Sequence, residues 1–569
     1  MNRRFSFSTL IILLSGTLFF GGVKVGNALV QHQTTDEEHD KMDKPLNFKS
    51  AYPHPWDRPG PSSPVVHMGT ARAAGMVERP LDLMDKDIDL AIENRVMPGA
   101  VVMVVRRGAI AKWKSYGYAA RYTDSNFTEM DHLIKMRTDT IFDLASLSKL
   151  FTATAVMQLW DQGAFSLDDP GAKYLPEFSA NGKENVTIKQ LLTHTSGFRP
   201  DPPRHLYEIE GTRENRLNYV LKQPLTEKPG THDVYSDINY IALGVLVERL
   251  TGQREDQYIR DHISEPLNMK DTMYNPPRNL KVRVAATESQ PWTGREMIWG
   301  EVHDENAWAL DGVAGHAGLF SSAHDLAVFG QMMLNHGIYA GKCVLSQKAV
   351  QLIKTNWNEA FPGQDHGLGW ELSQGWYMDA LADLHTIGHT GYTGTSIVVS
   401  PNNNTIVILL TNRVHPTRHT PSANEIRRAV ARRTADAIPV SMPTKDAAWF
   451  SGYGNGLNRT LTAKVDTGHK AHLSYKTWYR TEKGYDLGNL EVSSNGSDWT
   501  AIKQYTGSSG DWLNQTIGLP ERTEFVRFRY QTDAMVNGRG WYVFDAKLLT
   551  DGKAARPEWI SDGWVKRGY

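Results

Sequence analysis

The chain has 569 residues, a formal net charge of −1 at pH 7, 22% charged residues and 40% hydrophobic residues. This length exceeds that of one ordinary domain, so we expect two or three domains. The mixed, near-neutral charge gives no electrostatic reason to expect nucleic acid or an anionic surface as a partner. The single cysteine, Cys343, cannot form an internal disulfide, and we expect it to pack as a small apolar side chain.

Residues 1–28 have the layout of a secretory signal peptide. Arg3 and Arg4 precede an apolar run over residues 5–23, and Gly26-Asn27-Ala28 supplies small residues at a cleavage spacing. Because the apolar run is nearly long enough to span a bilayer, an uncleaved membrane anchor is the alternative. Both interpretations predict a secreted or cell-envelope protein.

Residues 29–80 are polar and then rich in proline and histidine, which indicates a linker or wrapping arm. The elements predicted after it are an amphipathic helix from Asp82, strands at 100–106 and 109–116, mainly helices to about 337, strands at 395–400 and 405–411, and a helix at about 423–437. Strands at both ends of a helical middle predict one mixed domain over residues 81–440. Its sheet would be closed by pairing the first and last strands.

The composition changes after Pro443. Short, alternating, aromatic-rich segments separated by Gly, Asn and Asp predict a β-sandwich over residues 446–569. The predicted fold class is therefore α/β, of the α+β kind: an antiparallel sheet flanked by helices, followed by an all-β sandwich.

The stretch "IFDLASLSKLFTATAVMQLWDQG" places Ser146 and Lys149 three residues apart at the start of a helix, so the two side chains share a face. In one interpretation Ser146 caps the helix and Lys149 is solvated. In the other, Ser146 is a nucleophile and Lys149 its base. The helix after Lys149 is apolar nearly all round, so it should be buried, and burial would lower the pKa of Lys149.

Two later motifs have the residue types of an acyl-transfer site. Tyr235 and Asp237 precede an apolar helix, where Tyr235 would relay a proton to a leaving group. His389-Thr390-Gly391 opens a β-hairpin at whose edge a substrate backbone would lie. The amide of Tyr392 would then pair with that of Ser146 as an oxyanion hole. The alternatives are a core tyrosine with an aspartate cap, and an ordinary strand with a turn histidine.

The order Ser-x-x-Lys, Tyr-x-Asp, His-Thr-Gly resembles the serine β-lactamase and penicillin-binding protein superfamily, specifically its class C-like branch. The resemblance covers about residues 82–437. "LLTHTSGF" supports it, and "WGEVHDENAWALDG" and "VAGHAGLFSSAHDLAVFGQMMLNHG" look closest to the penicillin-binding protein 4B group, with muropeptide amidases also similar. It implies a β-lactamase/DD-peptidase-like fold. It also implies that Ser146 is acylated, that Lys149 is its base and that Tyr235 is the catalytic tyrosine. His389, Thr390 and Gly391 would line the carboxylate side of the substrate.

Two residues depart from the pattern of this superfamily. Asp237 stands where the family has asparagine, so an amide donor to a substrate carbonyl is lost. His389 stands where the family has lysine, and a histidine is charged only part of the time near neutral pH. Both changes weaken the expectation of strong β-lactamase or transpeptidase activity, and neither touches acyl transfer itself.

Four other polar residues lie in the stretches that carry the resemblance. His194 is expected to shape a loop, Asp304 and Glu305 to be structural, and His316, in a Gly/Ala-rich loop, to border the pocket as a substrate contact. The sequence has no His-Glu-x-x-His and no cysteine cluster, so we expect no metal and no cofactor.

The C-terminal segment resembles the β-sandwich of immune inhibitor A-type secreted peptidases, through "LSYKTWYRTEKGYDLGNLEVSSNGSDW" and "RFRYQTDAMVNGRGWYVFDAKL". Relatives often end the second stretch with paired aspartates that are sometimes tied to calcium. Phe544 precedes Asp545 here, which argues against calcium at that point. The resemblance implies docking to wall glycans or protein, or stabilisation of the catalytic domain. Four tryptophans would stack on sugars if exposed, although core packing is their usual role: Trp478, Trp499, Trp512 and Trp541.

The expected function is that of an exported serine hydrolase acting through an acyl-enzyme. D-alanyl-D-alanine carboxypeptidase action on peptidoglycan stem peptides is the first interpretation. An esterase or muropeptide amidase is the alternative, and a non-catalytic cell-wall binding protein is the second alternative.

Overall fold

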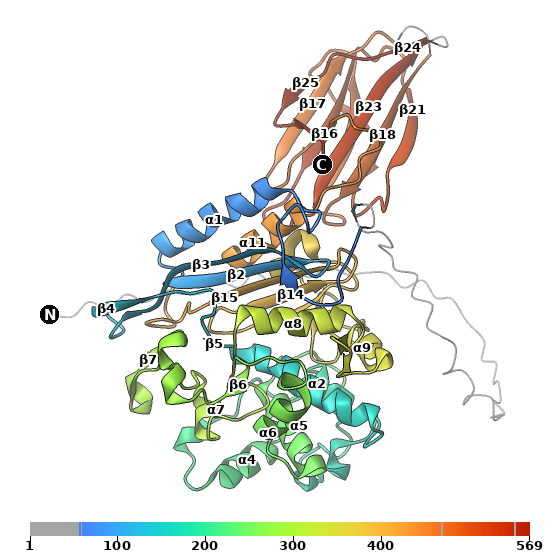
Figure 1. Ribbon diagram of the computed structural model, residues 1–569. Helices are drawn as coiled ribbons and strands as arrows, with labels where there is room; N and C mark the ends of the chain where they lie inside the picture. The colour runs from blue at the N-terminus through green and yellow to red at the C-terminus, as the bar shows by residue number, and fades with distance from the viewer. Residues whose placement is uncertain (1–55, 58–59, 468–469, 551–552) are drawn as a thin grey trace, which may run out of the picture. The chain divides into compact units, whose positions relative to one another are not determined.

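The computed structural model describes residues 56–57, 60–467, 470–550 and 553–569 (Figure 1). The predicted signal peptide and much of the 29–80 segment lie outside these residues. Within the described part of the chain, none of the helices combines the length and apolar character needed to cross a membrane.

The centre of the hydrolase-like region is an eight-stranded sheet in the order β1-β3-β2-β15-β14-β13-β12, with β4 paired to β3. The strands are β1 (His67–Met68), β2 (Gly99–Arg106), β3 (Ala109–Tyr122), β4 (Glu129–Lys135), β12 (Glu371–Leu372), β13 (Ile387–Thr390), β14 (Ser396–Ser400) and β15 (Thr405–Thr411). β2 and β15 pair antiparallel, with Val104 opposite Val407, as the sequence predicted. β1 joins β3 in parallel, so part of the expected arm forms an edge strand.

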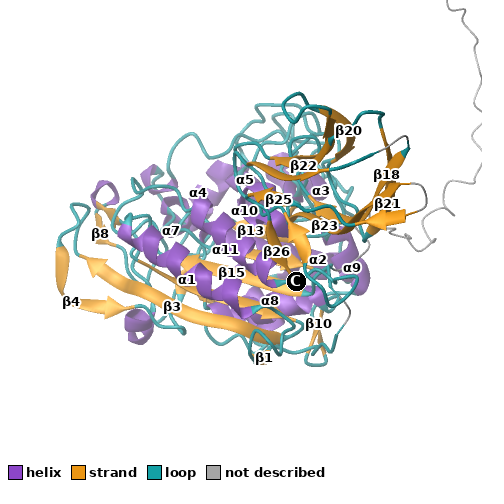
Figure 2. Ribbon diagram, turned by 90° about the horizontal axis from the view of Figure 1, so that it is seen from above, coloured by secondary structure: helices purple, strands orange, loops and turns teal. Residues whose placement is uncertain are grey.

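The sheet is covered on both faces, which explains why every residue of β2 is buried. Alternate residues of a strand point to opposite faces. Val101 and Met103 enter the core shared with α2 (Ser148–Asp161) and α8 (Ala323–Leu334). Val102 and Val104 enter the core shared with α1 (Glu78–Glu93) and α11 (Asn424–Ala437). In Figures 1 and 2, α1 and α11 lie together over one face of the sheet.

The region between β4 and β12 is mainly helical and carries two buried helices. α2 is buried from Ser148 to Leu159, as its uniform apolar character predicted, and α5 (Asp237–Thr251) packs against it. The other helices are α3 (Ile188–Leu192), α4 (Arg213–Leu221), α6 (Glu255–Ile259), α7 (Glu305–Ala309), α9 (Gln347–Ile353) and α10 (Gly375–Met378). The small strands are β5 (Phe142–Asp143), β6 (Met273–Tyr274), β7 (Ser289–Gln290), β8 (Arg295–Met297), β9 (Leu319–Ser321), β10 (Ile338–Tyr339) and β11 (Lys342–Cys343).

The C-terminal region consists of two antiparallel sheets. One has the order β21-β18-β23-β16-β26 with β24 on β23, and the other β20-β19-β22-β17-β25. The strands are β16 (Ala448–Phe450), β17 (Asn458–Lys464), β18 (Ala471–Arg480), β19 (Leu487–Ser493), β20 (Thr500–Tyr505), β21 (Leu513–Leu519), β22 (Phe525–Gln531), β23 (Gly540–Thr550), β24 (Lys553–Ala555), β25 (Ile560–Asp562) and β26 (Val565–Arg567). Leu473 and Trp541 from the first sheet share a core with Leu490 and Phe528 from the second. The predicted fold class, a mixed α/β domain followed by a strand-rich sandwich, is confirmed.

Side-chain burial decides between the alternatives for two tryptophans and corrects the expectation for Cys343. Trp478 and Trp541 belong to cores, so neither offers a face to a sugar. Cys343 is exposed rather than packed as an apolar side chain, because it lies on the short hairpin strand β11.

Asp57 ties the segment before α1 to the sheet. Arg106, at the end of β2, is fully buried, and its Nη2 lies 2.7 Å from Asp57 Oδ1. Arg107 Nη2 lies 3.0 Å from Asp57 Oδ2. A buried guanidinium is tolerated only when it is paired and hydrogen-bonded.

We therefore expect Asp57→Ala to destabilise the hydrolase region by about 3–5 kcal/mol, because the substitution leaves a buried cation without its carboxylate. Differential scanning calorimetry measures the effect. Asp131→Ala, at an exposed position of β4, is the control and should change the melting temperature little. An Asp57→Ala protein as stable as this control would contradict the assignment.

Candidate active site

Ser146 is presented by a tight turn in front of α2. It lies in a 3₁₀ turn over Ala145–Leu147, and Ala145 has a φ of +48°, a conformation that costs energy for a non-glycine residue. The amide of Ala145 donates to Asp143 Oδ1 at 2.8 Å, which stabilises this turn. Lys149, in the first turn of α2, donates from Nζ to Ser146 Oγ at 3.0 Å. The predicted pair is therefore in contact.

Lys149 is fully buried and surrounded by oxygen atoms. Besides Ser146, its Nζ donates to the carbonyl of His316 at 3.1 Å and forms an ion pair with Asp237 Oδ1 at 2.8 Å. Burial alone would lower the pKa of Lys149, but the attraction of Asp237 and the contact with Tyr235 raise it above the ordinary value. The direction is opposite to the one expected from the sequence. Lys149 is an ammonium at neutral pH, and Asp237 is the reason.

Tyr235 lies over this ion pair on a loop fixed by His194. The Lys149 ammonium is 4.9 Å from the centre of the Tyr235 ring. The His194 ring is 4.5 Å from that of Tyr235, and its Nδ1 accepts from the amide of Ser236 at 3.0 Å. Removal from water raises the pKa of Tyr235 to about 12, against the opposing effects of Lys149 and of the hydrogen bonds to Lys149 and Ser146. Tyr235 is therefore a neutral phenol beside the nucleophile.

The end of β13 borders the nucleophile on another side. A Cβ at Gly391 would lie 2.4 Å from the carbonyl oxygen of Leu144, so only glycine allows this close approach. Neither the amide of Ser146 nor that of Tyr392 donates to another described residue. These amides have the unpaired state that an oxyanion hole requires.

His389 is buried at the start of the third motif and does not supply a positive charge. Its Nδ1 donates to the carbonyl of Thr390 at 2.7 Å, and its Nε2 has no hydrogen-bond partner among the described residues. Burial, with the nearby Lys149 ammonium, lowers the pKa of His389 to about 3. The imidazole is therefore neutral and presents a nitrogen acceptor to the pocket.

The buried His316 and the partly exposed Asp304 form a second pair. His316 Nε2 donates to Asp304 Oδ1 at 2.9 Å, and Asp304 also caps α7 by accepting from the amide of Ala307 at 2.7 Å. Burial would lower the pKa of His316, but Asp304 raises it. Asp237, Asp304 and His316 lie close enough to hold an ion. Their charges are already matched by Lys149 and by each other, which makes this cluster unsuited to a metal.

Two hollows share Ser146, Tyr235 and Tyr392 and differ in charge. One, of about 330 Å³, is lined by His389, Thr390, Gly391, Arg413 and Arg427. The other, of about 370 Å³, is lined by Asp201, Asp237, Asp304, Glu305 and His316. Glu371 also lines the first hollow and Arg418 the second, so arginines outnumber carboxylates on one side of the nucleophile and carboxylates outnumber the arginine on the other.

Two arginines of the first hollow were not singled out from the sequence. Arg413 follows the end of β15, and its guanidinium lies 5.5 Å from the Tyr392 ring. Arg427 of α11 donates to the carbonyl of Gly391 at 2.7 Å. The sequence offered one signal for Arg413: it is a charged residue just beyond the end of a predicted strand, 405–411. No comparable signal existed for Arg427, which reaches the site from a helix.

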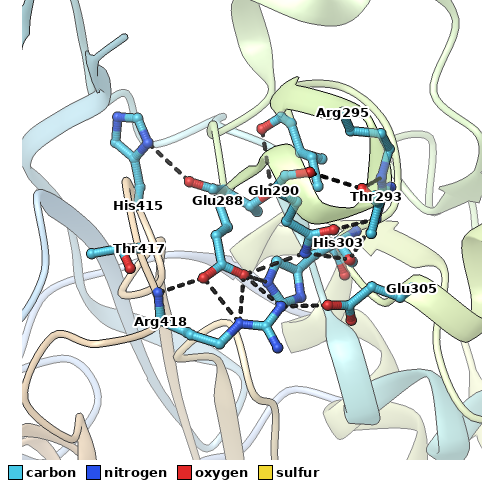
Figure 3. A network of polar contacts seen from close by, with 12 residues as sticks. Glu288, Gln290, Thr293, Arg295, His303, Glu305, His415, Thr417 and Arg418 are labelled. Atoms are coloured by element: carbon cyan, nitrogen blue, oxygen red, sulfur yellow. Dashed lines mark hydrogen bonds and ion pairs between the residues drawn. The ribbon is translucent and has the colours of Figure 1, made fainter. Parts of the chain in front are cut away.

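An ionic network joins Glu288, Glu305 and Arg418, with His303 beside them (Figure 3). Arg418 forms ion pairs with Glu288 at 2.7 Å and Glu305 at 2.6 Å. His303 Nε2 lies 2.8 Å from Glu288 Oε2, and the His303 ring stacks on Tyr392 at 5.7 Å. These contacts join three segments: the one with Glu288, the one with His303 and Glu305, and the one with Arg418. The His303 ring connects this network to Tyr392, which borders the hollows at Ser146.

Ser146 and the exposed Tyr235 beside the buried Lys149, next to two unpaired amides, have the layout of a serine hydrolase site. The family model described as Beta-lactamase matches residues 83–432, and the chain belongs to that family.

The chain is also similar to relatives that are named for two different activities. The chain is 35% identical over 373 residues to the N-acetylmuramyl-L-alanine amidase of Bacillus subtilis (strain 168), covering 60% of this chain and 83% of the relative. It is 34% identical over 370 residues to a putative D-alanyl-D-alanine carboxypeptidase of Salmonella schwarzengrund (strain CVM19633), covering 59% and 84%. The structure of EstCE1, a hydrolase with promiscuous acyltransferase activity, is similar in fold with a TM-score of 0.50 at 20% identity, over 63% of this chain and 98% of that one.

The ion pair between Lys149 and Asp237 predicts a specific effect of Asp237→Asn on the pH dependence of acylation. Without the carboxylate, burial dominates and the pKa of Lys149 falls, so the ammonium is lost at a lower pH. If the charged form supports catalysis, acylation by a short-chain nitrophenyl ester, measured by stopped flow between pH 6 and 10, will decline at a lower pH than in the wild type. An Asp237→Asn protein whose acylation instead accelerates with pH would make neutral Lys149 the base. Asp201→Asn, a carboxylate of the same hollow without an ion pair to Lys149, should keep the wild-type profile.

Proposed function

We propose that this chain is an exported serine peptidase that removes the C-terminal D-alanine from peptidoglycan stem peptides through an acyl-enzyme on Ser146. The observation that carries the proposal is that Arg413, a cation, lines the same hollow as Thr390 and Gly391. Its Nε and Nη1 form no hydrogen bond with another described residue, so they are available to a carboxylate. A C-terminal D-alanine has such a carboxylate next to the bond that is cut.

The reaction follows from the positions of the protons. Ser146 Oγ attacks the carbonyl carbon, and the amides of Ser146 and Tyr392 stabilise the oxyanion. Because Lys149 is already protonated, Tyr235 is the group that accepts the Ser146 proton as it gives its own to the leaving nitrogen. The Lys149 ammonium, held by Asp237, orients both hydroxyl groups and stabilises the negative charge that develops on them. Water then hydrolyses the ester by the reverse sequence.

Hydrolysis of the amide between a muramyl group and L-alanine is the second candidate. It is supported by the named activity of the Bacillus subtilis relative. It is also supported by the hollow that Asp201 and Glu305 line, because such carboxylates can accept hydrogen bonds from sugar hydroxyl groups. An esterase would use the same group of residues. A purely binding role has less support, because Ser146, Lys149 and Tyr235 are retained in contact with one another.

We further propose that residues 1–28 direct export and that the substrate is met in the cell envelope. The support is the arginine pair followed by the apolar run in the sequence. Attachment of the C-terminal sandwich to wall glycan or protein is a proposal that rests on its resemblance to domains of secreted peptidases.

A substrate panel tests the reaction. We expect D-alanine release from a peptide ending in D-Ala-D-Ala, and loss of this activity by at least about 1,000-fold in Ser146→Ala. Muropeptides and a short-chain nitrophenyl ester complete the panel. Turnover of muropeptides to free peptide without D-alanine release would select the amidase. Full activity of Ser146→Ala would contradict any acyl-enzyme at this residue.

The role of Arg413 is tested by Arg413→Met with a matched pair of substrates. Loss of a charged hydrogen bond should raise KM about 10–100-fold for a peptide with a free C-terminal carboxylate. The same peptide with a C-terminal carboxamide should be cleaved equally by both proteins. An equal loss on both peptides would assign Arg413 a structural role instead.

A further inference from the structure

Two connecting loops of the C-terminal sandwich bring three carboxylates together. Glu482 and Asp486 lie between β18 and β19, and Asp533 lies between β22 and β23. Each loop crosses from one sheet of the sandwich to the other. Carboxylate oxygens of the three residues lie within 4.8 Å of one another.

No cation among the described residues balances the carboxylates. None of the three forms an ion pair with a described residue. Arg428 is the cation that acts on Glu482 from a distance, but it is engaged in ion pairs with Asp379 and Glu425. Three acidic groups at this separation repel one another strongly unless a proton or a cation lies between them.

The most buried member of the cluster has an unsatisfied oxygen. Asp486 is fully buried, and its Oδ1 has no hydrogen-bond partner among the described residues. Its Oδ2 has only long contacts, from the amide of Glu482 and the hydroxyl of Tyr530, both at 3.4 Å. Oε2 of Glu482 is likewise buried without a partner. Buried acceptors of this kind are rare, because leaving them unpaired costs free energy.

Burial and mutual repulsion act on these groups together. Burial raises the pKa of Glu482 to about 7, with Asp533 and Asp486 adding to the rise. Burial also raises the pKa of Asp486 to about 6, although nearby backbone amides oppose it. A bound cation would remove this penalty and keep all three groups ionised.

We propose that Glu482, Asp486 and Asp533 form a calcium site that joins the two sheet-crossing loops of the sandwich. An all-oxygen, carboxylate-rich set suits a hard divalent cation, and Ca²⁺ accepts more ligands and a less regular geometry than Mg²⁺. Glu482 and Asp533 are partly exposed, so the ion can enter from solvent and complete its coordination with water. Asp545, the position where the sequence argued against calcium, is paired with Lys547 and Arg556 and takes no part.

Isothermal titration of the EDTA-treated full chain with CaCl₂ tests the site. We expect one Ca²⁺ per chain, weaker binding of MgCl₂, and a higher melting temperature in CaCl₂ than in EDTA. Asp533→Asn and Glu482→Gln should weaken Ca²⁺ binding at least about ten-fold, because each removes a charged ligand. These two partly exposed positions keep the test valid if Asp486→Asn fails to fold. Asp562→Asn, an exposed carboxylate of the same region, should bind as the wild type does.

Three results would overturn the proposal. The first is no Ca²⁺ binding at millimolar concentration, with equal melting temperatures in CaCl₂ and EDTA. The second is unchanged binding in Asp533→Asn and Glu482→Gln, which would place the ion elsewhere. The third is a melting temperature that rises from pH 8 to pH 5 and does not change with Ca²⁺. That result would show that protons, rather than a cation, relieve the repulsion between the carboxylates.

Discussion

The buried ion pair between Lys149 and Asp237 determines how the rest of the site works. Its 2.8 Å contact places a positive charge behind Ser146 in a part of the protein where burial alone would remove it. This charge lies beneath Tyr235 and contacts the nucleophile, so both hydroxyl groups are oriented by one ammonium. Aspartate in the second motif, where the resembling family has asparagine, therefore sets the electrostatics of the site.

The fold supplies the rigid frame that such a pair needs. α2, which carries Lys149, is buried along its length against α5, which begins at Asp237. The partners are thus on two packed helices, and their separation does not depend on a mobile loop. β13 approaches the turn before α2 so closely that Gly391 leaves no room for a side chain, and Tyr392 and Ser146 border the same hollow.

Much of this was predictable from sequence because it depends on local pattern. Three features show this: the strands β2 and β15, the uniformly apolar α2 and the Ser146–Lys149 spacing. Each depends on residues close in sequence or on the apolar character of a whole face. The direction of the Lys149 pKa shift was not predictable, because it depends on Asp237, a residue distant in sequence whose side chain points at Nζ. Arg427 and the cluster of Glu482, Asp486 and Asp533 were missed for the same reason: their meaning comes from loops or helices that only the fold brings together.

The protonation state of Lys149 is the most direct test of this account. Protein labelled with ¹³C at lysine Cε, with the Lys149 signal assigned by its loss in Lys149→Arg, can be titrated by NMR. The account predicts that the Lys149 signal keeps the chemical shift of an ammonium from pH 6 to pH 10, because Asp237 holds the proton. A titration of that signal between pH 6 and pH 8 would contradict the account and return Lys149 to the role of free base.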